Sequence, residues 1–413
     1  MLGPVIAAFA LLLVREAERR KIDRLLFVAR DGHLLREATR TLLQKLHSTR
    51  ALELGYIHLS RRATAPAIFE AMDETAVHAA AAVRAGPLTL AKVLEFHGLP
   101  AGLAEPWAGR HLLAPDQPIR SPSMLAGLIA DRDFQVAVAA KVAQQKQHLS
   151  RYLAQQGLDV HSTAALVDIG WRGSIQNNLS QMLPEVAGLY FGLWAEGGPP
   201  SSLPAAAKGL ICDQRRGRNI REGSAWYAAH LLEAICRAPE GTTLGYAEAG
   251  GRIVPVLAAD AGCGAETATA GAADEIRAGI LDRTGQLAND SAWNSQPDLE
   301  LRRAAQEALF HLAFFPGPDA IAIGRSLVHT EGHAEGWSTP LIAAGPDRPF
   351  SAPRRWLAGL ASPWRAGYVC ATGGKGLAWL FAGAEALLVS LPPNTRDLLA
   401  GLARRWAGLS APR

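Results

Sequence analysis

This 413-residue sequence lacks several motifs that identify common classes of protein. It has four cysteines and no CxxC pair, so the sequence indicates neither a disulfide scaffold nor a zinc site. A basic stripe interleaved with aromatic side chains is absent and the net charge is only +4, which argues against a nucleic acid partner. We therefore expect reduced thiols and a cytoplasmic location.

Long apolar runs are missing too. Residues 2–14 form an apolar start, but a helix that crosses a bilayer needs about 20 residues. This segment also lacks the basic region and the small-residue cleavage site of a signal peptide, so we expect a core helix packed against the first strand. The isoelectric point of about 9.0 fits anionic ligands or the acidic inner face of a membrane, and peripheral membrane contact is kept as an alternative.

The composition, with 49% hydrophobic and 19% charged residues, is typical of a folded protein, and the length is sufficient for two domains. Four short apolar runs alternate with stretches of helical periodicity, which predicts an α/β fold with a largely parallel sheet. These strand candidates are residues 24–29, 54–59, 164–169 and 187–194.

The segment between the second and third strand candidates is much longer than a crossover helix requires. Its helical periodicity predicts an insertion at residues 76–155, which serves as a hood or acceptor-docking element or only packs. Residues 1–75 and 156–257 are then the α/β core, and residues 258–413 a mainly helical C-terminal domain. The Ala/Gly/Thr-rich segment 258–274 is the expected linker.

Two loops carry most of the functional information. Residues 25–33 read Leu-Leu-Phe-Val-Ala-Arg-Asp-Gly-His, and residues 165–175 read Ala-Leu-Val-Asp-Ile-Gly-Trp-Arg-Gly-Ser-Ile. Each runs from an apolar strand through a glycine-bearing turn into a helical pattern, so backbone N–H groups at the start of a helix offer an anion site. Two such sites in one domain suit a ligand with phosphate groups at opposite ends.

These loops resemble the pyrophosphate loop and the phosphoribosyl-binding loop of type I phosphoribosyltransferases. Together with Leu-Ser-Arg-Arg-Ala at residues 59–63, they are more closely similar to the phosphoribosyltransferase modules of bacterial polysaccharide (O-antigen and capsule) assembly proteins. The resemblance covers roughly residues 1–240. It implies a type I phosphoribosyltransferase-like core that transfers 5-phosphoribose from phosphoribosyl pyrophosphate, with Mg²⁺, to a sugar hydroxyl of a lipid-linked glycan. Inversion would give a 5-phospho-β-ribofuranoside.

By this resemblance, the second loop holds the phosphoribosyl group. Backbone N–H groups and a hydroxyl would cradle the 5-phosphate, and Asp168 would accept hydrogen bonds from the ribose hydroxyls. The alternative for Asp168 is a strand-end aspartate that caps a turn. The residues expected to bind the phosphate are Gly170, Trp171, Arg172, Gly173 and Ser174.

The resemblance assigns the pyrophosphate to the first loop and to the segment after the second strand. Gly32 would permit a backbone shape that a side chain forbids, and arginines would contact phosphate oxygens bidentately. A surface ion pair for Arg30, solvated charges for the paired arginines and a helix-start role for His33 are the alternatives. The residues expected at the diphosphate are Arg30, Asp31, Gly32, His33, Ser60, Arg61 and Arg62.

The sequence departs from nucleotide phosphoribosyltransferases at two acids of the second loop, where Val167 and Trp171 stand instead. In nucleobase enzymes the later acid assists a nitrogen atom, so its loss argues against a purine or pyrimidine acceptor. A sugar hydroxyl benefits from a general base, and Asp31 is the candidate for this role or, alternatively, for a Mg²⁺ ligand. Two candidates for an acceptor groove are Tyr227 and Glu233.

Two other functions stay open. A phosphoribosyltransferase-like fold also serves as a non-catalytic binding module or as a scaffold for polysaccharide enzymes. Residues 28–32 resemble, in addition, the Asp-x-Asp-Gly opening of haloacid-dehalogenase phosphatases. There the nucleophile would fall at Ala29, which cannot form an aspartyl-phosphate. We therefore expect the phosphatase, like the partner glycosyltransferase, to be a separate protein.

Overall fold

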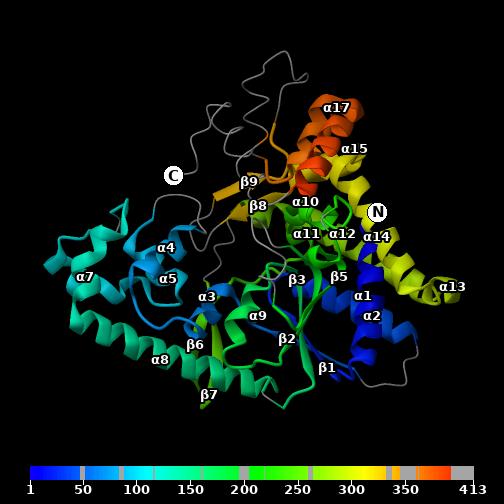
Figure 1. The fold of residues 1–413 in the computed structure, drawn as a ribbon. Coiled ribbons are helices and arrows are strands. Elements are labelled where there is room, and N and C mark those ends of the chain that lie inside the picture. Colours follow the sequence, from blue (N-terminus) through cyan, green and yellow to red (C-terminus); the bar gives the residue numbers. More distant parts are fainter. Residues whose placement is uncertain are drawn as a thin grey trace.

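The computed structural model describes residues 1–46, 52–82, 88–114, 117–159, 161–194, 204–217, 219–258, 264–331, 337–344, 360 and 362–391. A five-stranded parallel sheet in the order β2-β1-β3-β4-β5 lies at its centre (Figure 1). The α/β fold and the four predicted strands are confirmed, and a fifth, unpredicted strand follows them. The strands are β1 (Arg24–Val28), β2 (Glu53–Ile57), β3 (Ala164–Trp171), β4 (Ala187–Leu193) and β5 (Ala207–Asp213).

The strand order reverses beside β1. From β1 the chain runs through α2 (Gly32–Leu46) to β2 on one side, whereas β3 pairs with β1 on the other side, with Phe27 opposite Val167. The loops that leave β1 and β3 therefore diverge at the same edge of the sheet. In open parallel sheets such a switch point is where ligands bind.

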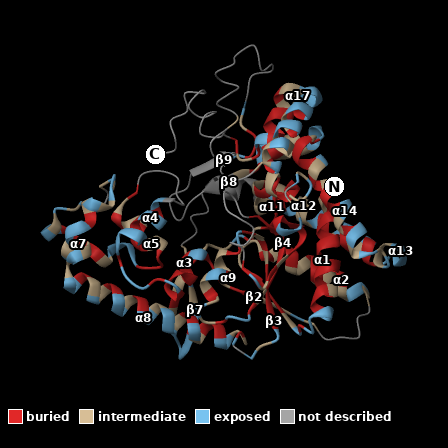
Figure 2. Ribbon diagram, in the orientation of Figure 1, coloured by how far each residue is buried: buried red, intermediate tan, exposed pale blue. Residues whose placement is uncertain are grey.

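Alternate residues of β1 pack into two different hydrophobic cores, one on each face of the sheet. Leu25 and Phe27 belong to a core under the helices α1 (Leu2–Arg19) and α2, and Leu26 and Val28 belong to a core on the opposite face. Near-continuous apolar strands of this kind are typical of a parallel sheet covered on both faces. Figure 2 shows α1 and the strands as the most continuously buried part of the molecule.

The opposite face is covered by α8 (Arg132–Gln155), by α9 (Ser174–Leu179) and by a hairpin of β6 (Thr243–Ala249) and β7 (Arg252–Leu257). Tyr152 of α8 stacks on Tyr246 of β6, with ring centroids 4.6 Å apart. The sequence analysis did not predict this hairpin. Its turn, Gly250-Gly251, has φ of +57° and +75°, which is a hairpin signal that the sequence carries openly.

The described part of the segment between β2 and β3 is helical and forms a lobe beside the sheet, with a hydrophobic core of its own (Figure 1). The periodicity of residues 124–155 predicts one continuous helix, but the helix breaks at Asp131, whose carboxylate accepts hydrogen bonds from two backbone N–H groups and so caps α8. Before α8 come α3 (Arg61–Thr64), α4 (Glu74–Ala82), α5 (Leu90–Phe96), α6 (Glu105–Ala108) and α7 (Ala126–Ala130).

The region after β7 is mainly helical. The predicted linker at residues 258–274 is wrong from Gly264 onward, because the alanine-rich sequence there forms the first turns of a long helix. The sequence predicts turns over residues 340–355 and a helix over residues 377–407, and of these, residues 345–355 and 392–407 lie outside the described ranges. The elements are α10 (Ser224–Tyr227), α11 (Ala229–Cys236), α12 (Gly264–Ala288), α13 (Ser291–Asn294), α14 (Asp298–Phe314), α15 (Pro318–Ser326), β8 (Val328–Glu331), β9 (Trp337–Pro340) and α17 (Arg365–Ser390).

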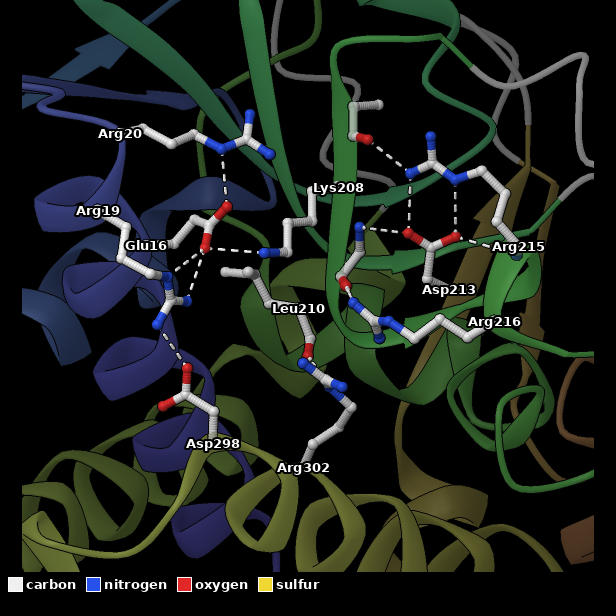
Figure 3. Close-up of polar contacts among 12 residues, drawn as sticks. Glu16, Arg19, Arg20, Lys208, Leu210, Asp213, Arg215, Arg216, Asp298 and Arg302 are labelled. Atoms are coloured by element: carbon white, nitrogen blue, oxygen red, sulfur yellow. Dashed lines mark hydrogen bonds and ion pairs between the residues drawn. The ribbon is translucent and has the colours of Figure 1, made fainter.

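The exposed edge of the sheet at β5 is closed by side chains. Arg215 and Arg302 donate hydrogen bonds to carbonyl oxygens of β5 at 2.5 and 3.0 Å (Figure 3), and Gln306 donates a third at 2.7 Å. Nearby, the buried carboxylate of Glu16 is ion-paired with Arg19, Arg20 and Lys208, which joins α1 to β5. These contacts leave the edge strand unsuited to pairing with another chain.

No helix in the described ranges combines the length and the apolar character needed to cross a membrane.

Candidate functional site

The two loops chosen from the sequence meet at the switch point of the sheet. Asp31 lies in the turn from β1 to α2, and Asp168 lies in β3, the strand next to β1. The negative charge of Asp31 raises the pKa of Asp168, so the two carboxylates lie near enough to interact electrostatically. The two loops, whose aspartates are 137 positions apart in the sequence, therefore leave neighbouring strands at the same edge of the sheet.

The first loop is anchored to a segment that the sequence analysis did not single out. The carbonyl oxygen of Arg30 accepts hydrogen bonds from the backbone N–H groups of His33 at 3.2 Å and Ala238 at 3.0 Å. The Arg30 guanidinium donates to the Thr242 hydroxyl at 3.3 Å, and the Arg237 guanidinium lies 3.8 Å from the Asp31 carboxylate. Residues 237–242, after α11, thus add a second cation, which only the tertiary structure brings to this loop.

Gly32 serves close packing. A Cβ atom on Gly32 would lie 3.0 Å from the backbone carbon of Phe27, closer than real Cβ contacts allow without movement. The sequence analysis expected Gly32 to permit a special backbone shape, but its φ is not among the positive values. The absent side chain instead lets α2 start directly against β1. Its neighbour His33 lies in the first turn of this helix, and its ring is roughly perpendicular to that of Tyr56, with the centroids 6.1 Å apart.

The second loop turns sharply because three of its residues have positive φ: +111° at Gly170, +77° at Trp171 and +62° at Gly173. Trp171 is the unusual member, since this region disfavours side chains. It is held there because its indole N–H donates to Glu233 at 2.8 Å and its carbonyl accepts from the Trp194 N–H at 2.7 Å. Glu233 on α11 is thereby brought to the site.

The helix after this loop differs from the expected one. The helical spacing of Ile175, Leu179 and Met182 predicts a helix that reaches Met182, but α9 ends at Leu179 and has only six residues. A helix this short has little macrodipole, so an anion at Ser174 would depend on the N–H groups of the loop itself. The side chain of Arg172 is exposed beside them.

The residues after β2 separate into different roles. The Ser60 hydroxyl caps α3 by accepting from the Ala63 N–H at 2.9 Å, and it donates to the Thr243 carbonyl at 2.6 Å. Arg62 is buried and ion-paired with Glu95 of α5 at 3.2 Å, so it ties this loop to the helical lobe. Arg61 is exposed, and its positive charge lowers the pKa of Asp31 and of Asp168. Of the two predicted arginines, Arg61 is therefore the one whose charge reaches the site.

The electrostatic balance at the site is unusual for aspartates. Burial raises the pKa of Asp31 to about 6, against the lowering effect of Arg237, and burial together with the charge of Asp31 raises the pKa of Asp168 to about 8. Glu233 adds to both increases. A carboxylate whose pKa is raised in this way is stabilised when it binds a cation, accepts a hydrogen bond from a hydroxyl group or takes up a proton.

No protein-family model and no curated protein matches this chain.

The carboxylate oxygens fit a hard cation such as Mg²⁺, which typically binds one or two carboxylates and completes its shell with substrate phosphates and water. Within the described ranges, no three His, Cys, Asp or Glu side chains form a metal site on their own. Asp31 would accordingly contribute one carboxylate ligand, and phosphate oxygens and water would complete the coordination.

A pocket of about 670 Å³ lies at the opposite, amino-terminal edge of the sheet, lined by Asp23, Arg24, Glu53 and Asp159 among others. There, Arg24 is already paired with Glu53 at 2.6 Å and with the Gln156 carbonyl at 2.8 Å. We favour the carboxyl-terminal edge as the functional site, because ligands of parallel sheets bind there and because the aspartates with raised pKa lie there.

Proposed function

We propose that this chain is a glycosyltransferase that transfers 5-phosphoribose from phosphoribosyl pyrophosphate, as its magnesium complex, to a sugar hydroxyl of a glycan. One observation carries the proposal: a pair of aspartates with raised pKa lies between two glycine-bearing loops at the switch point of the sheet, with arginine charges on the side of the first loop. A ligand with a diphosphate at one end and a monophosphate at the other suits this distribution.

Each end of the donor has its own set of residues in this proposal. Arg30, Arg61 and Arg237 would bind the diphosphate, and the loop of residues 170–174 would hold the 5-phosphate. Asp168 would accept hydrogen bonds from the ribose hydroxyls. Magnesium, when bound, would neutralise charge on the leaving diphosphate. The protein supplies position and electrostatic stabilisation while C1 of the ribose develops positive charge.

The reaction breaks the bond from C1 to the diphosphate oxygen and forms a bond from C1 to the acceptor oxygen. Pyrophosphate leaves with the electron pair, and the acceptor proton goes to a carboxylate, for which Asp31 is the first candidate; its other role would be as a magnesium ligand. The first loop shields the α face, so the acceptor attacks from the other side and the product is a β-ribofuranoside.

The product keeps its 5-phosphate, because Ala29 stands where a haloacid-dehalogenase phosphatase has its nucleophile. A separate phosphatase would remove the phosphate and a separate glycosyltransferase would extend the chain. Within this proposal the acceptor is a lipid-linked glycan, and the enzyme works in the cytoplasm at the inner face of the membrane.

The test incubates the purified protein with phosphoribosyl pyrophosphate, Mg²⁺ and lipid-linked glycans and measures pyrophosphate release. Mass spectrometry and anomeric coupling constants then identify the product, which should be a phosphorylated β-linked pentose. An α-linked or unphosphorylated pentose would refute the mechanism. Donor binding without turnover on any glycan would instead favour the non-catalytic binding module.

A further inference from the structure

Glu233 is another carboxylate near the paired aspartates, and in the proposed transfer it offers an alternative to Asp31 as the group that takes the acceptor proton. In that reaction the acceptor approaches C1 from the face opposite the pyrophosphate. Asp31 belongs to the same loop as Arg30 and lies 3.8 Å from Arg237, so it stands with the cations on the side of the leaving group. A proton acceptor for the incoming hydroxyl is needed on the other side.

Glu233 reaches the site from α11 through the second loop. Its Oε1 atom accepts the indole N–H of Trp171 at 2.8 Å, and Trp171 is itself fixed by the Trp194 N–H and by the edge of the Trp226 ring at 6.1 Å. The carboxylate is therefore aimed by the loop that would hold the phosphoribosyl group. Its charge raises the pKa of both Asp31 and Asp168, so it lies near enough to both to interact electrostatically.

The outer oxygen of this carboxylate is directed to a histidine that solvent can reach. Oε2 lies 3.4 Å from Nδ1 of His230, one turn earlier on α11, and the side chains of Glu233 and His230 are 18% and 35% exposed. A partly exposed carboxylate is accessible to an incoming acceptor hydroxyl, and the imidazole offers a route for the proton to leave.

We propose that Glu233 is the general base of the transfer and that Asp31 is a magnesium ligand. The hydrogen bond from Trp171 orients the Glu233 carboxylate, and His230 then takes the proton from it. The inference rests on the proposed function and refines it. The acceptor O–H proton passes to the Glu233 carboxylate as the acceptor oxygen bonds to C1, while the C1–O bond to pyrophosphate breaks and its electron pair leaves with pyrophosphate. The acidic residue that Trp171 replaces in the second loop is thus supplied by Glu233 of α11.

The test compares wild-type protein with Glu233→Gln in two assays, using magnesium phosphoribosyl pyrophosphate with water as the acceptor. The amide oxygen of glutamine still accepts the Trp171 N–H, so we expect donor affinity by calorimetry to stay within about 3-fold while kcat for pyrophosphate release falls about 100-fold. Formate should restore part of kcat to Glu233→Ala. The matched Asp31→Asn variant should raise the Mg²⁺ concentration needed for half-maximal rate.

The outcomes separate the two proposals. A Glu233→Gln variant with kcat within about 5-fold of wild type overturns the inference and leaves the proposed function intact. Loss of donor affinity in Glu233→Gln, with no rescue of Glu233→Ala by formate, shows a structural role and also overturns the inference. A wild-type protein that neither binds nor cleaves the donor overturns the proposed function and, with it, the role of Glu233.

Discussion

Replacing Asp168 with asparagine should stabilise the unliganded protein, because the carboxylate is held at an electrostatic cost. Burial and the charge of Asp31 raise its pKa from 3.8 to about 8, which corresponds to at most about 6 kcal/mol of destabilisation once the group is ionised. The side chain is only partly buried and Arg61 lies near it, so screening reduces this to about 2 kcal/mol. Asparagine keeps an oxygen that accepts the Ile169 N–H, as Asp168 does at 2.8 Å.

The sign of the pH dependence follows from the raised pKa. Asp168 is neutral in both folded and unfolded chains below about pH 4, and its destabilising effect grows as pH rises toward about 8. Urea denaturation should therefore show Asp168→Asn to be more stable than wild type by about 2 kcal/mol at pH 8.5 and by much less at pH 4.5. A variant that is less stable than wild type at pH 8.5 would refute the reasoning and favour a turn-capping role.

Three further predictions concern the rest of the molecule. Glu16→Gln should lower the free energy of unfolding by about 2 kcal/mol at pH 7, because its cationic partners lower the pKa of Glu16 from 4.5 to about 2; in urea denaturation, the loss should vanish as pH falls from 4.5 toward 2. Gly32→Ala should destabilise by about 1–3 kcal/mol through its contact with β1, whereas Gly279→Ala, in open space on α12, should stabilise by about 0.5–1 kcal/mol, and a reversed order of melting temperatures contradicts this. Affinity for Mg²⁺ should rise from pH 5 to pH 8 as the metal displaces the proton from Asp31, whose pKa is raised to about 6, and equal affinities by calorimetry would contradict it.

The sheet and the meeting of the two loops were predictable because both depend on local signals. Apolar runs mark β1 and β3 in the sequence, and the carboxyl ends of parallel strands lie at one edge, which brings Asp31 and Asp168 together. The helix at residues 264–274 was missed because alanine was read as linker composition, although alanine favours a helix.

The finer arrangement of the site depends on contacts that no local pattern encodes. Arg237 reaches Asp31 from far along the chain, and the indole of Trp171 selects Glu233 among the polar residues of α11. Arg61 and Arg62 are identical in sequence terms, yet one is exposed near the aspartates and the other is paired with Glu95. Only tertiary packing separates such neighbours.

The central claim, that a donor with two phosphate ends bridges the loops after β1 and β3, is tested most directly by calorimetric titration of magnesium phosphoribosyl pyrophosphate. Wild-type protein should bind it, and Asp168→Ala and Gly173→Val should each weaken binding at least about 10-fold. The first variant removes the carboxylate that would accept hydrogen bonds from the ribose hydroxyls, and the second places a β-branched side chain at a residue with φ of +62°. The exposed control Asp319→Ala on α15 should bind as wild type does. Wild-type affinity in both loop variants, or no binding by the wild type, would contradict the account.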